Sequence, residues 1–320
     1  MGRILVTGAA GTIGLHVTSA LLECGHSVVG VSLEPTSSIS HKHFTYQKLD
    51  IGDYQAIDSM LSEQSIDGLI HLAALVHVRD SKLSFSDYCR QNFRASEHLF
   101  QKAYSHGVRR IVFASTIEVY GPTPSKRLVN EDISCRPESD YARSKLLGEE
   151  ALVAAASLAN ASYSILRLAP VYASDFRLNL NKRLYLRAPT IGYYVSKGDY
   201  ELSLCSIRNI EHFVIRWLEL ESATSGVFNL ADARAYPVRE LLESERRKGR
   251  CPITLRLPYF PCLGAIAILE TCLALVGRQS NMATVGNVRK LIRSTAWDTS
   301  RAEQVVGHLP WNMENTMNGT

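Results

Sequence analysis

The sequence predicts an α/β protein with a doubly wound parallel sheet and a smaller C-terminal lobe. Apolar runs of strand length alternate with runs of helix length through the first half of the 320 residues. A glycine-rich turn, VTGAAGTIG at 6–14, joins the first strand to the first helix. Strands separated by helices with right-handed crossovers form a parallel sheet that is covered on both faces.

Each element follows from its residue pattern. The first strand is expected around ILV at 4–6 and the first helix over 12–25, with Gly25 as a C-cap. HSVVGVSL at 26–33 supplies the next strand and completes a βαβ unit. Further strands are expected at 65–71, 109–116 and 163–173, and helices at 86–107 and 140–159.

The alternation weakens after residue 175, which sets the expected domain boundaries. Residues 1–173 should form a dinucleotide-binding domain, to which 205–230 returns through the strand-like run GVFNLA. Residues 174–204 and 231–320 should form the substrate-binding lobe.

The glycine turn predicts an anion site. Gly8, Gly11 and Gly14 allow a tight turn and a close approach by another group, and the N–H groups of Thr12 and Ile13 begin the helix. Such a helix N-terminus favours a phosphate through its unpaired N–H groups and its dipole. Because the turn lies within a βαβ unit, we expect a dinucleotide there.

Composition excludes several other classes. Apolar residues make up 46% of the chain, the net charge is +4, and the scattered basic residues leave no nucleic-acid footprint. The seven cysteines include no C-x-x-C pair, so we expect no metal site and reduced thiols in a cytoplasmic protein. We expect no secretory signal, because the first strand begins within the first residues of the sequence.

The apolar run 262–277 raises the question of a membrane helix. It is shorter than the ~18–20 residues that a spanning helix needs, and Glu270 interrupts it. A buried or interface helix is favoured, because a membrane-surface helix would have a basic polar face. We therefore expect no membrane span.

Several motifs together resemble a known family. They are TGAAGTIG, Asp50 in LDIGD, HLAA at 71–74, Asn92, STIEVYG at 115–121 and YARSK at 141–145. In this order they resemble an extended short-chain dehydrogenase/reductase with a Rossmann-type sheet, similar to nucleotide-sugar epimerases, dehydratases and reductases. The resemblance continues to WDTSRAEQVVGHLP near the end of the sequence and implies a homodimer through the helices around 92–106 and 141–156.

Tyr141 and Lys145 are the expected catalytic pair. They are four residues apart and therefore share a helix face. A nearby ammonium and a positively charged nicotinamide should lower the phenol pKa from ~10 towards working pH, so that Tyr141 can take a proton from a sugar hydroxyl. The resemblance adds Thr116 as a hydrogen-bond donor to the same oxygen, Lys145 as a ribose ligand and Asn92 as a brace for the helix.

The resemblance also implies cofactor contacts. Asp50 and Ile51 would surround the adenine, Leu72, Ala73 and Ala74 would follow the dinucleotide, and Ser115 would lie beside it, whereas His71 is expected to be a packed structural residue. Ser32 stands where many NAD enzymes have an acid, and no arginine follows to bind a 2′-phosphate. Glu34 would repel that phosphate if it points inward, so NAD is favoured and NADP stays open.

Two departures from the family pattern bear on the reaction. Ile117 replaces the aspartate of dehydratases, while Glu118 remains, which favours an epimerase. Pro170 replaces an asparagine that often contacts substrate, so the pyrophosphate needs other partners. The candidates for that role are Lys182, Arg183, Arg187 and Arg208.

The resulting prediction is an NAD-dependent nucleotide-sugar epimerase, acting on a UDP-hexose at carbon 4 in polysaccharide biosynthesis. An NADPH-dependent reductase of a keto sugar and a sterol-type alcohol dehydrogenase remain alternatives. A catalytically silent NAD(P)-sensing protein is disfavoured, because a sensor needs no Thr116, Tyr141 and Lys145 set.

Overall fold

A seven-stranded parallel sheet forms the centre of the computed structural model, which describes residues 1–76, 83–123, 128–187, 189–275 and 294–318. The predicted doubly wound α/β fold is confirmed. In sheet order the strands are β13 (Gly226–Leu230), β7 (Ser162–Leu168), β5 (Arg110–Thr116), β4 (Gly68–His71), β1 (Arg3–Thr7), β2 (Ser27–Ser32) and β3 (Phe44–Lys48).

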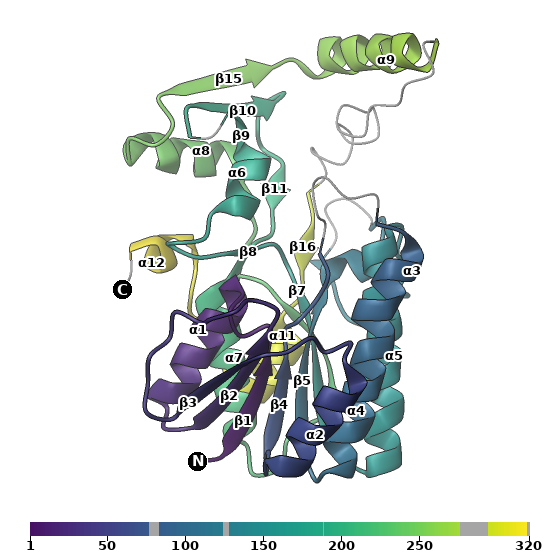
Figure 1. Cartoon of the computed structure of the whole chain (residues 1–320). Coiled ribbons are helices and arrows are strands. Elements are labelled where there is room, and N and C mark those ends of the chain that lie inside the picture. Colours follow the sequence, from purple (N-terminus) through teal and green to yellow (C-terminus); the bar gives the residue numbers. More distant parts are fainter. Residues whose placement is uncertain (77–82, 124–127, 188, 276–293, 319–320) are drawn as a thin grey trace.

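Helices cover both faces of this sheet (Figure 1). One face carries α1 (Thr12–Glu23), α7 (Ile207–Glu219) and α11 (Ser300–Val306). The other carries α2 (Tyr54–Glu63), α4 (Ala95–Ser105) and α5 (Asp140–Ala159), and the short helix α3 (Phe85–Tyr88) leads through the π-helix η1 (Cys89–Arg94) into α4. Each layer has its own apolar core, because strand side chains alternate between the two faces.

The observed elements differ from the sequence prediction in three respects. The expected strand 163–173 is divided, because β7 ends at Leu168 and Pro170 follows, and β8 (Val171–Tyr172) pairs instead with β12 (Cys205–Ser206). The edge strand β3 and the helix α2 were not predicted. β13, which lies within the run GVFNLA, pairs in parallel with β7 at the edge of the sheet.

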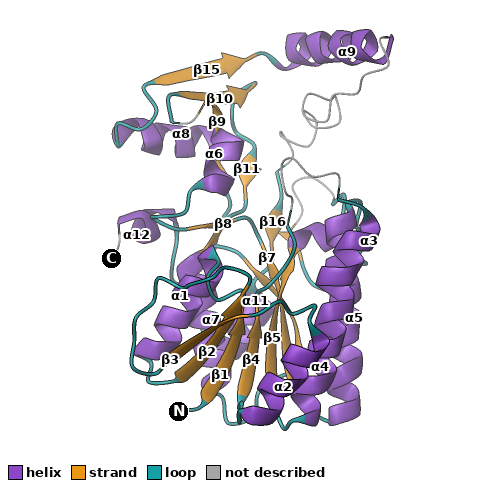
Figure 2. Ribbon diagram, in the orientation of Figure 1, coloured by secondary structure: helices purple, strands orange, loops and turns teal. Residues whose placement is uncertain are grey.

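A smaller lobe lies beyond the carboxyl ends of the strands (Figure 2). A third apolar cluster forms its core. Its elements are α6 (Leu178–Leu184), β9 (Tyr185–Arg187), β10 (Ile191–Val195), β11 (Glu201–Leu202), β14 (Tyr236–Pro237), α8 (Val238–Arg247), β15 (Ile253–Leu257), α9 (Tyr259–Leu275) and α12 (Met313–Asn318).

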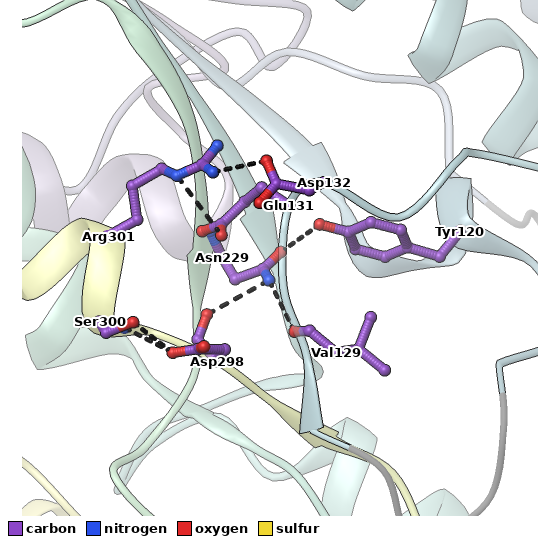
Figure 3. Close-up of polar contacts among 8 residues, drawn as sticks. All are labelled: Tyr120, Val129, Glu131, Asp132, Asn229, Asp298, Ser300 and Arg301. Atoms are coloured by element: carbon purple, nitrogen blue, oxygen red, sulfur yellow. Dashed lines mark hydrogen bonds and ion pairs between the residues drawn. The ribbon is translucent and has the colours of Figure 1, made fainter.

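Part of the C-terminal region packs on the sheet, although the sequence assigned 231–320 to the lobe. β16 (Ala296–Trp297) pairs with β6 (Leu128–Val129), and α11 packs on α7 and β13. Figure 3 shows the polar contacts at this junction. The side chain of Asn229 in β13 donates to the carbonyl oxygens of Val129 (3.1 Å) and Asp298 (3.3 Å) and accepts from the Tyr120 hydroxyl (2.6 Å).

A buried carboxylate completes the same junction. Glu131 accepts from the backbone N–H of Asn229 at 2.7 Å. The Arg301 Nε atom lies 3.8 Å from the other carboxylate oxygen of Glu131. Burial raises the pKa of Glu131, and the Asn229 N–H and Arg301 oppose that effect. These contacts join three segments far apart in the sequence into one unit.

The apolar helix α9 is not buried against the rest of the described chain. Phe260, Ile268 and Leu269 are 80%, 66% and 44% exposed, so the burial favoured by the sequence is not found for these side chains. Among the described helices, none has the length and apolar character needed to cross a bilayer.

Candidate active site

The three glycines of the turn meet different surroundings. Gly8 has φ +70°, and a Cβ there would lie 2.8 Å from the backbone nitrogen of Ala73. A Cβ on Gly14 would collide with the carbonyl oxygen of Gly8. Gly11, the N-cap of α1, has an ordinary extended backbone, and a Cβ would meet only the Gly8 oxygen, at 3.2 Å. The fold itself therefore requires Gly8 and Gly14, whereas Gly11 leaves open space beside the helix N-terminus.

A pocket opens beside this turn, at the carboxyl ends of β1, β2 and β4. No side chain caps α1, so no side chain accepts from the N–H groups of its first turn. The pocket contains eight of the residues that the sequence analysis assigned to the cofactor: Gly8, Gly11, Ser32, Asp50, Ile51, Leu72, Ala73 and Ala74.

The pocket also contains residues that the sequence analysis did not assign. Leu33, Leu75 and Gln91 line it, and Gln91 donates to the Asp50 carboxylate at 3.3 Å. Gln91 lies in the π-helix η1. The residue pattern of this helix does not indicate that Gln91 contacts Asp50, in the loop after β3. The carboxylate of Asp50 also accepts from the Gly52 N–H at 2.8 Å, which fixes the loop after β3.

Glu34 points into the pocket. The Ser32 hydroxyl donates to its carboxylate, and the Tyr46 hydroxyl donates to its backbone oxygen at 2.7 Å. The hydrogen bond from Ser32 lowers the pKa of Glu34, so the carboxylate is negatively charged at neutral pH. The inward direction, which the sequence left open, places a negative charge at the end of β2.

His71 lies in the core and fixes the turn after β4. Ser96 donates its proton to the Asn92 carbonyl (3.0 Å), so its oxygen accepts from His71 Nε2 (2.8 Å). His71 Nδ1 then accepts from Thr7 (2.6 Å), whose oxygen accepts from the Ala73 N–H (3.3 Å). Burial lowers the pKa of His71 well below its usual value, which agrees with a neutral ring.

Asn92 connects this turn to α5. Its side chain accepts from the Leu75 N–H at 2.7 Å and donates to the Leu75 oxygen at 2.9 Å and to Ser144 at 3.1 Å. The side chain is buried, and Ser144 lies between Tyr141 and Lys145 in sequence. Asn92 therefore joins the pocket wall to the part of α5 that carries both residues.

Tyr141 lies in the first turn of α5, close to Glu118. The helix begins after Ser139, which accepts from the Ala142 N–H at 3.1 Å and donates to Glu118 at 3.5 Å. Burial raises the pKa of Tyr141, and the charge of Glu118 raises it further. This rise belongs to the protein alone, where burial and a carboxylate act on the phenol without the positive charge of a nicotinamide.

Lys145 is buried one turn further along α5. Its ammonium lies 3.9 Å from the centre of the Phe113 ring. Burial lowers the pKa of Lys145 to about 7, and the charge of Glu149 opposes this effect. Glu149 itself accepts two hydrogen bonds from Arg167 Nε, at 3.2 Å to each carboxylate oxygen, and one from its terminal nitrogen, at 2.7 Å.

Glu149 is a site residue that the sequence analysis missed. It lies four residues after Lys145, so the helix period alone could have placed the two on one face. Ser115 donates to the same carboxylate, which directs its hydroxyl into the contact between β5 and α5. Thr116 caps the 3₁₀ helix η2 (Ile117–Tyr120) by accepting from the Glu118 N–H at 3.2 Å, so its hydroxyl hydrogen is directed elsewhere.

Of the four cations proposed for the substrate, Arg183 is close enough to Glu118 to feel its charge. It lies on α6, where burial lowers its pKa and the charge of Glu118 raises it. Lys182 is exposed on the same helix, and the side chain of Arg187 lies outside the described atoms. Arg208 pairs with Glu211 at 3.2 Å and lies over the Trp311 ring on the α1 side of the sheet.

Comparison of the sequence with models of protein families shows which family the chain belongs to. Residues 4–188 match the model of the NAD-dependent epimerase/dehydratase family. The chain belongs to this family. The matched range contains the glycine turn, Asn92, Thr116, Tyr141 and Lys145, and it ends within the lobe after β9.

Curated relatives of this family member are named UDP-glucose 4-epimerase. One from Caenorhabditis elegans is 32% identical over 170 residues, which are 47% of this chain and 48% of the relative. The chain thus spans about half the length of that relative. One from Halalkalibacterium halodurans is 27% identical over 274 residues and covers 78% of this chain and 81% of the relative.

Solved structures are similar to this chain over almost its full length. MoeE5 in complex with UDP-glucuronic acid and NAD is 26% identical with a TM-score of 0.75, covering 100% of this chain and 97% of that chain. The UDP-glucose 4-epimerase of Thermotoga maritima with UDP-glucose is 21% identical with a TM-score of 0.76, covering 98% of this chain and 96% of that chain. The second likeness supports the fold.

Proposed function

We propose that this protein is an NAD-dependent epimerase of a nucleotide-activated sugar, acting at carbon 4 of a UDP-hexose. The observation that carries the proposal is that Asn92 bonds both Leu75, in the wall of the glycine-turn pocket, and Ser144, in the turn of α5 that carries Tyr141 and Lys145. Thr116 ends β5 at the same carboxyl edge of the sheet. The similarity to UDP-glucose 4-epimerases supports the substrate class.

The pocket fits NAD on two grounds. The open side of Gly11 leaves room for a pyrophosphate against the backbone, and the uncapped N-terminus of α1 supplies N–H donors and positive dipole. The negative Glu34 at the end of β2 fits two ribose hydroxyls and repels a 2′-phosphate. When bound, NAD supplies the hydride acceptor and the positive charge of the nicotinamide.

Tyr141 is the proposed acid and base. Because burial and Glu118 raise its pKa, the phenol is protonated in the protein alone, and it becomes a base only when positive charge from Lys145 and the cofactor favours the phenolate. Thr116 donates a hydrogen bond to the same sugar oxygen, and Lys145 holds the nicotinamide ribose. Tyr141 takes the proton of the 4-hydroxyl and returns it after the keto sugar has turned over.

The residues around Tyr141 favour epimerisation over elimination. Loss of water needs an acid that protonates the departing hydroxyl, and Ile117 occupies the position that would supply it. Glu118 can accept a proton but has no acidic neighbour in η2 to donate one. Arg183, on the lobe side of this group, is the proposed phosphate ligand, with Lys182, Arg187 and Arg208 as further candidates.

The test is incubation of the protein with UDP-glucose, UDP-galactose, their N-acetyl forms and the corresponding uronic acids, without added NADH or NADPH. At least one should give a stereoisomer of equal mass, detected by chromatography and mass spectrometry. Tyr141→Phe should lower this turnover at least ~100-fold while the protein still folds and binds NAD. A product lighter by one water, or stoichiometric oxidation of NADPH with a keto sugar, would contradict the proposal.

Two further properties are part of the proposal. We place the enzyme in the cytoplasm, in polysaccharide biosynthesis, and we expect a homodimer through the helices around 92–106 and 141–156. Sedimentation equilibrium measures the second property, and a monomer at all concentrations would exclude it.

A further inference from the structure

The helix α9 exposes an apolar surface to solvent at the far end of the lobe. It runs for 17 residues, its only charged residue is Glu270, and its apolar side chains are spread around the helix instead of along one side. Phe260 and Ile268 are 80% and 66% exposed. Figure 1 shows α9 projecting beyond β15, away from the sheet. A helix that is apolar on all sides is normally covered.

The strand that leads into α9 continues this surface. β15 forms the edge of the lobe sheet, and its side chains Ile253 and Leu255 are 48% and 40% exposed. Both lie within 22 residues of Leu275, the end of α9, so the exposed apolar side chains belong to one continuous stretch of chain.

The same stretch carries an unusual concentration of positive charge. Residues 246–275 contain five of the 35 basic residues and one of the 31 acidic residues of the chain. The remainder then has 30 basic and 30 acidic residues, so the net charge of +4 arises entirely from this stretch. Four of its cations are described and exposed at the end of α8: Arg246, Arg247, Lys248 and Arg250.

We propose that α9 and the basic residues at 246–256 that precede it form a binding surface for an anionic phospholipid bilayer, with α9 buried in one leaflet. A helix satisfies its own backbone hydrogen bonds and can therefore leave water, and α9 is about 25 Å long at 1.5 Å per residue. The described cations that precede α9, at the end of α8 and on β15, bind the anionic headgroups. The helix lies in the leaflet and does not cross it.

Charge favours a bilayer over a second copy of this chain. Two copies that met through α9 would bring two strongly basic stretches together, and these would repel. The anionic headgroups of a bilayer instead attract the basic stretch, while the hydrocarbon interior of the bilayer covers the apolar side chains of α9. This proposal does not depend on the proposed enzymatic function, because binding to lipid is measured without any substrate.

The experiment is flotation of the full chain with vesicles of phosphatidylcholine alone or mixed with phosphatidylglycerol. The protein should float with the mixed vesicles, and high salt should weaken binding. Ile268→Glu with Leu269→Glu should reduce the bound fraction at least ~10-fold. Arg246→Glu with Arg247→Glu should reduce it at least ~30-fold, because two cations are lost and two repelling charges are gained.

A matched control is Leu158→Glu, which changes an 89% exposed leucine at the other end of the molecule, in α5. It should leave flotation unchanged. All variants should retain the wild-type thermal midpoint, which shows that they fold. The proposal is overturned if the wild type stays in the soluble fraction, or if it binds both kinds of vesicle equally. It is also overturned if Ile268→Glu with Leu269→Glu changes only the oligomeric state, since a second copy would then cover α9.

Discussion

At the residue scale, the glycine turn separates what the fold requires from what a ligand requires. Gly14 has no room for a Cβ, because the Gly8 carbonyl already lies against it, and Gly8 needs its positive φ. Gly11 has neither constraint, and its open side faces the pocket. Glycine at this position is therefore explained by the ligand and not by the packing of the chain.

This difference gives a paired prediction. Gly11→Val should fold with a loss of about 1 kcal/mol from its contact with the Gly8 oxygen, but it should not bind NAD in calorimetry. Gly14→Ala should lose about 3 kcal/mol of unfolding free energy, because the backbone of the turn must move. If Gly11→Val retained its NAD affinity, the turn would have only a structural role.

Lys145 gives a second prediction, on stability. Burial lowers the pKa of its ammonium from 10.5 to about 7, so between these values the folded protein binds fewer protons than the unfolded chain. The folded state is therefore destabilised as the pH falls from 10.5 to 7, and not further below 7.

Lys145→Met should accordingly raise the free energy of unfolding, by ~3–5 kcal/mol at pH 6 and by almost nothing near pH 10.5. Its turnover and NAD affinity should fall at the same time. Chemical denaturation at the two pH values checks the first point. An equal change in stability at both would mean that burial of the charge is not the cause.

At the element scale, the helix that carries Tyr141 and Lys145 is held by its neighbours. Asn92 occupies the π-helix η1, where the widened turn directs its amide to both Leu75 and Ser144. The loop after β4 and the helix α5 therefore share one buried side chain. A shift of either element would move the other.

Removing this amide should disturb the site as well as the fold. Asn92→Ala leaves the Leu75 N–H and oxygen without partners, which should cost about 2–4 kcal/mol of unfolding free energy and lower kcat more than NAD affinity. Asn160→Gly is the control, because it replaces the left-handed C-cap at the opposite end of α5. The brace would be refuted by a variant that loses stability but keeps its kcat.

The elements that could be predicted from sequence are those with a local pattern. The strands β1, β2, β4 and β5 are continuous apolar runs, and Gly25 and Gly107 end their helices at φ +84° and +88°. The edge strand β3, FTYQK, has mostly exposed residues and therefore no apolar run.

The site divides in the same way. Motif spacing identified the glycine turn, Thr116, Tyr141 and Lys145 as candidates. The direction of Glu34 and the reach of Gln91 depend on how the loop after β2 and the helix η1 meet the pocket, and no local pattern records this. The rise in the pKa of Tyr141 in the protein alone could not be predicted either, because burial depends on the surrounding fold.

At the scale of the whole molecule, cofactor binding should appear as stability. NAD at about 100 times its dissociation constant should raise the free energy of unfolding by about 2.7 kcal/mol. NADP at the same concentration should raise it less, because the charged Glu34 repels the 2′-phosphate.

Glu34→Gln keeps the shape and removes this charge, so the preference for NAD over NADP should fall roughly tenfold in a thermal-shift titration. Glu219→Gln, at an exposed ion pair on α7, is the control and should not change the preference. An undiminished preference in Glu34→Gln would show that another group excludes the phosphate.

The junction of Asn229 also has a consequence for synthesis. A ribosome releases the chain from its amino end, yet the amide of Asn229 in β13 depends on the carbonyl of Asp298, and the buried Glu131 depends on the cation of Arg301. A nascent chain that ends before these residues contains all seven strands of the central sheet but lacks one of the two carbonyl partners of the Asn229 amide and the cation beside Glu131. We therefore expect the nucleotide-binding half to complete its polar contacts only when the chain is almost fully synthesised, so that chaperones would meet a nearly full-length chain.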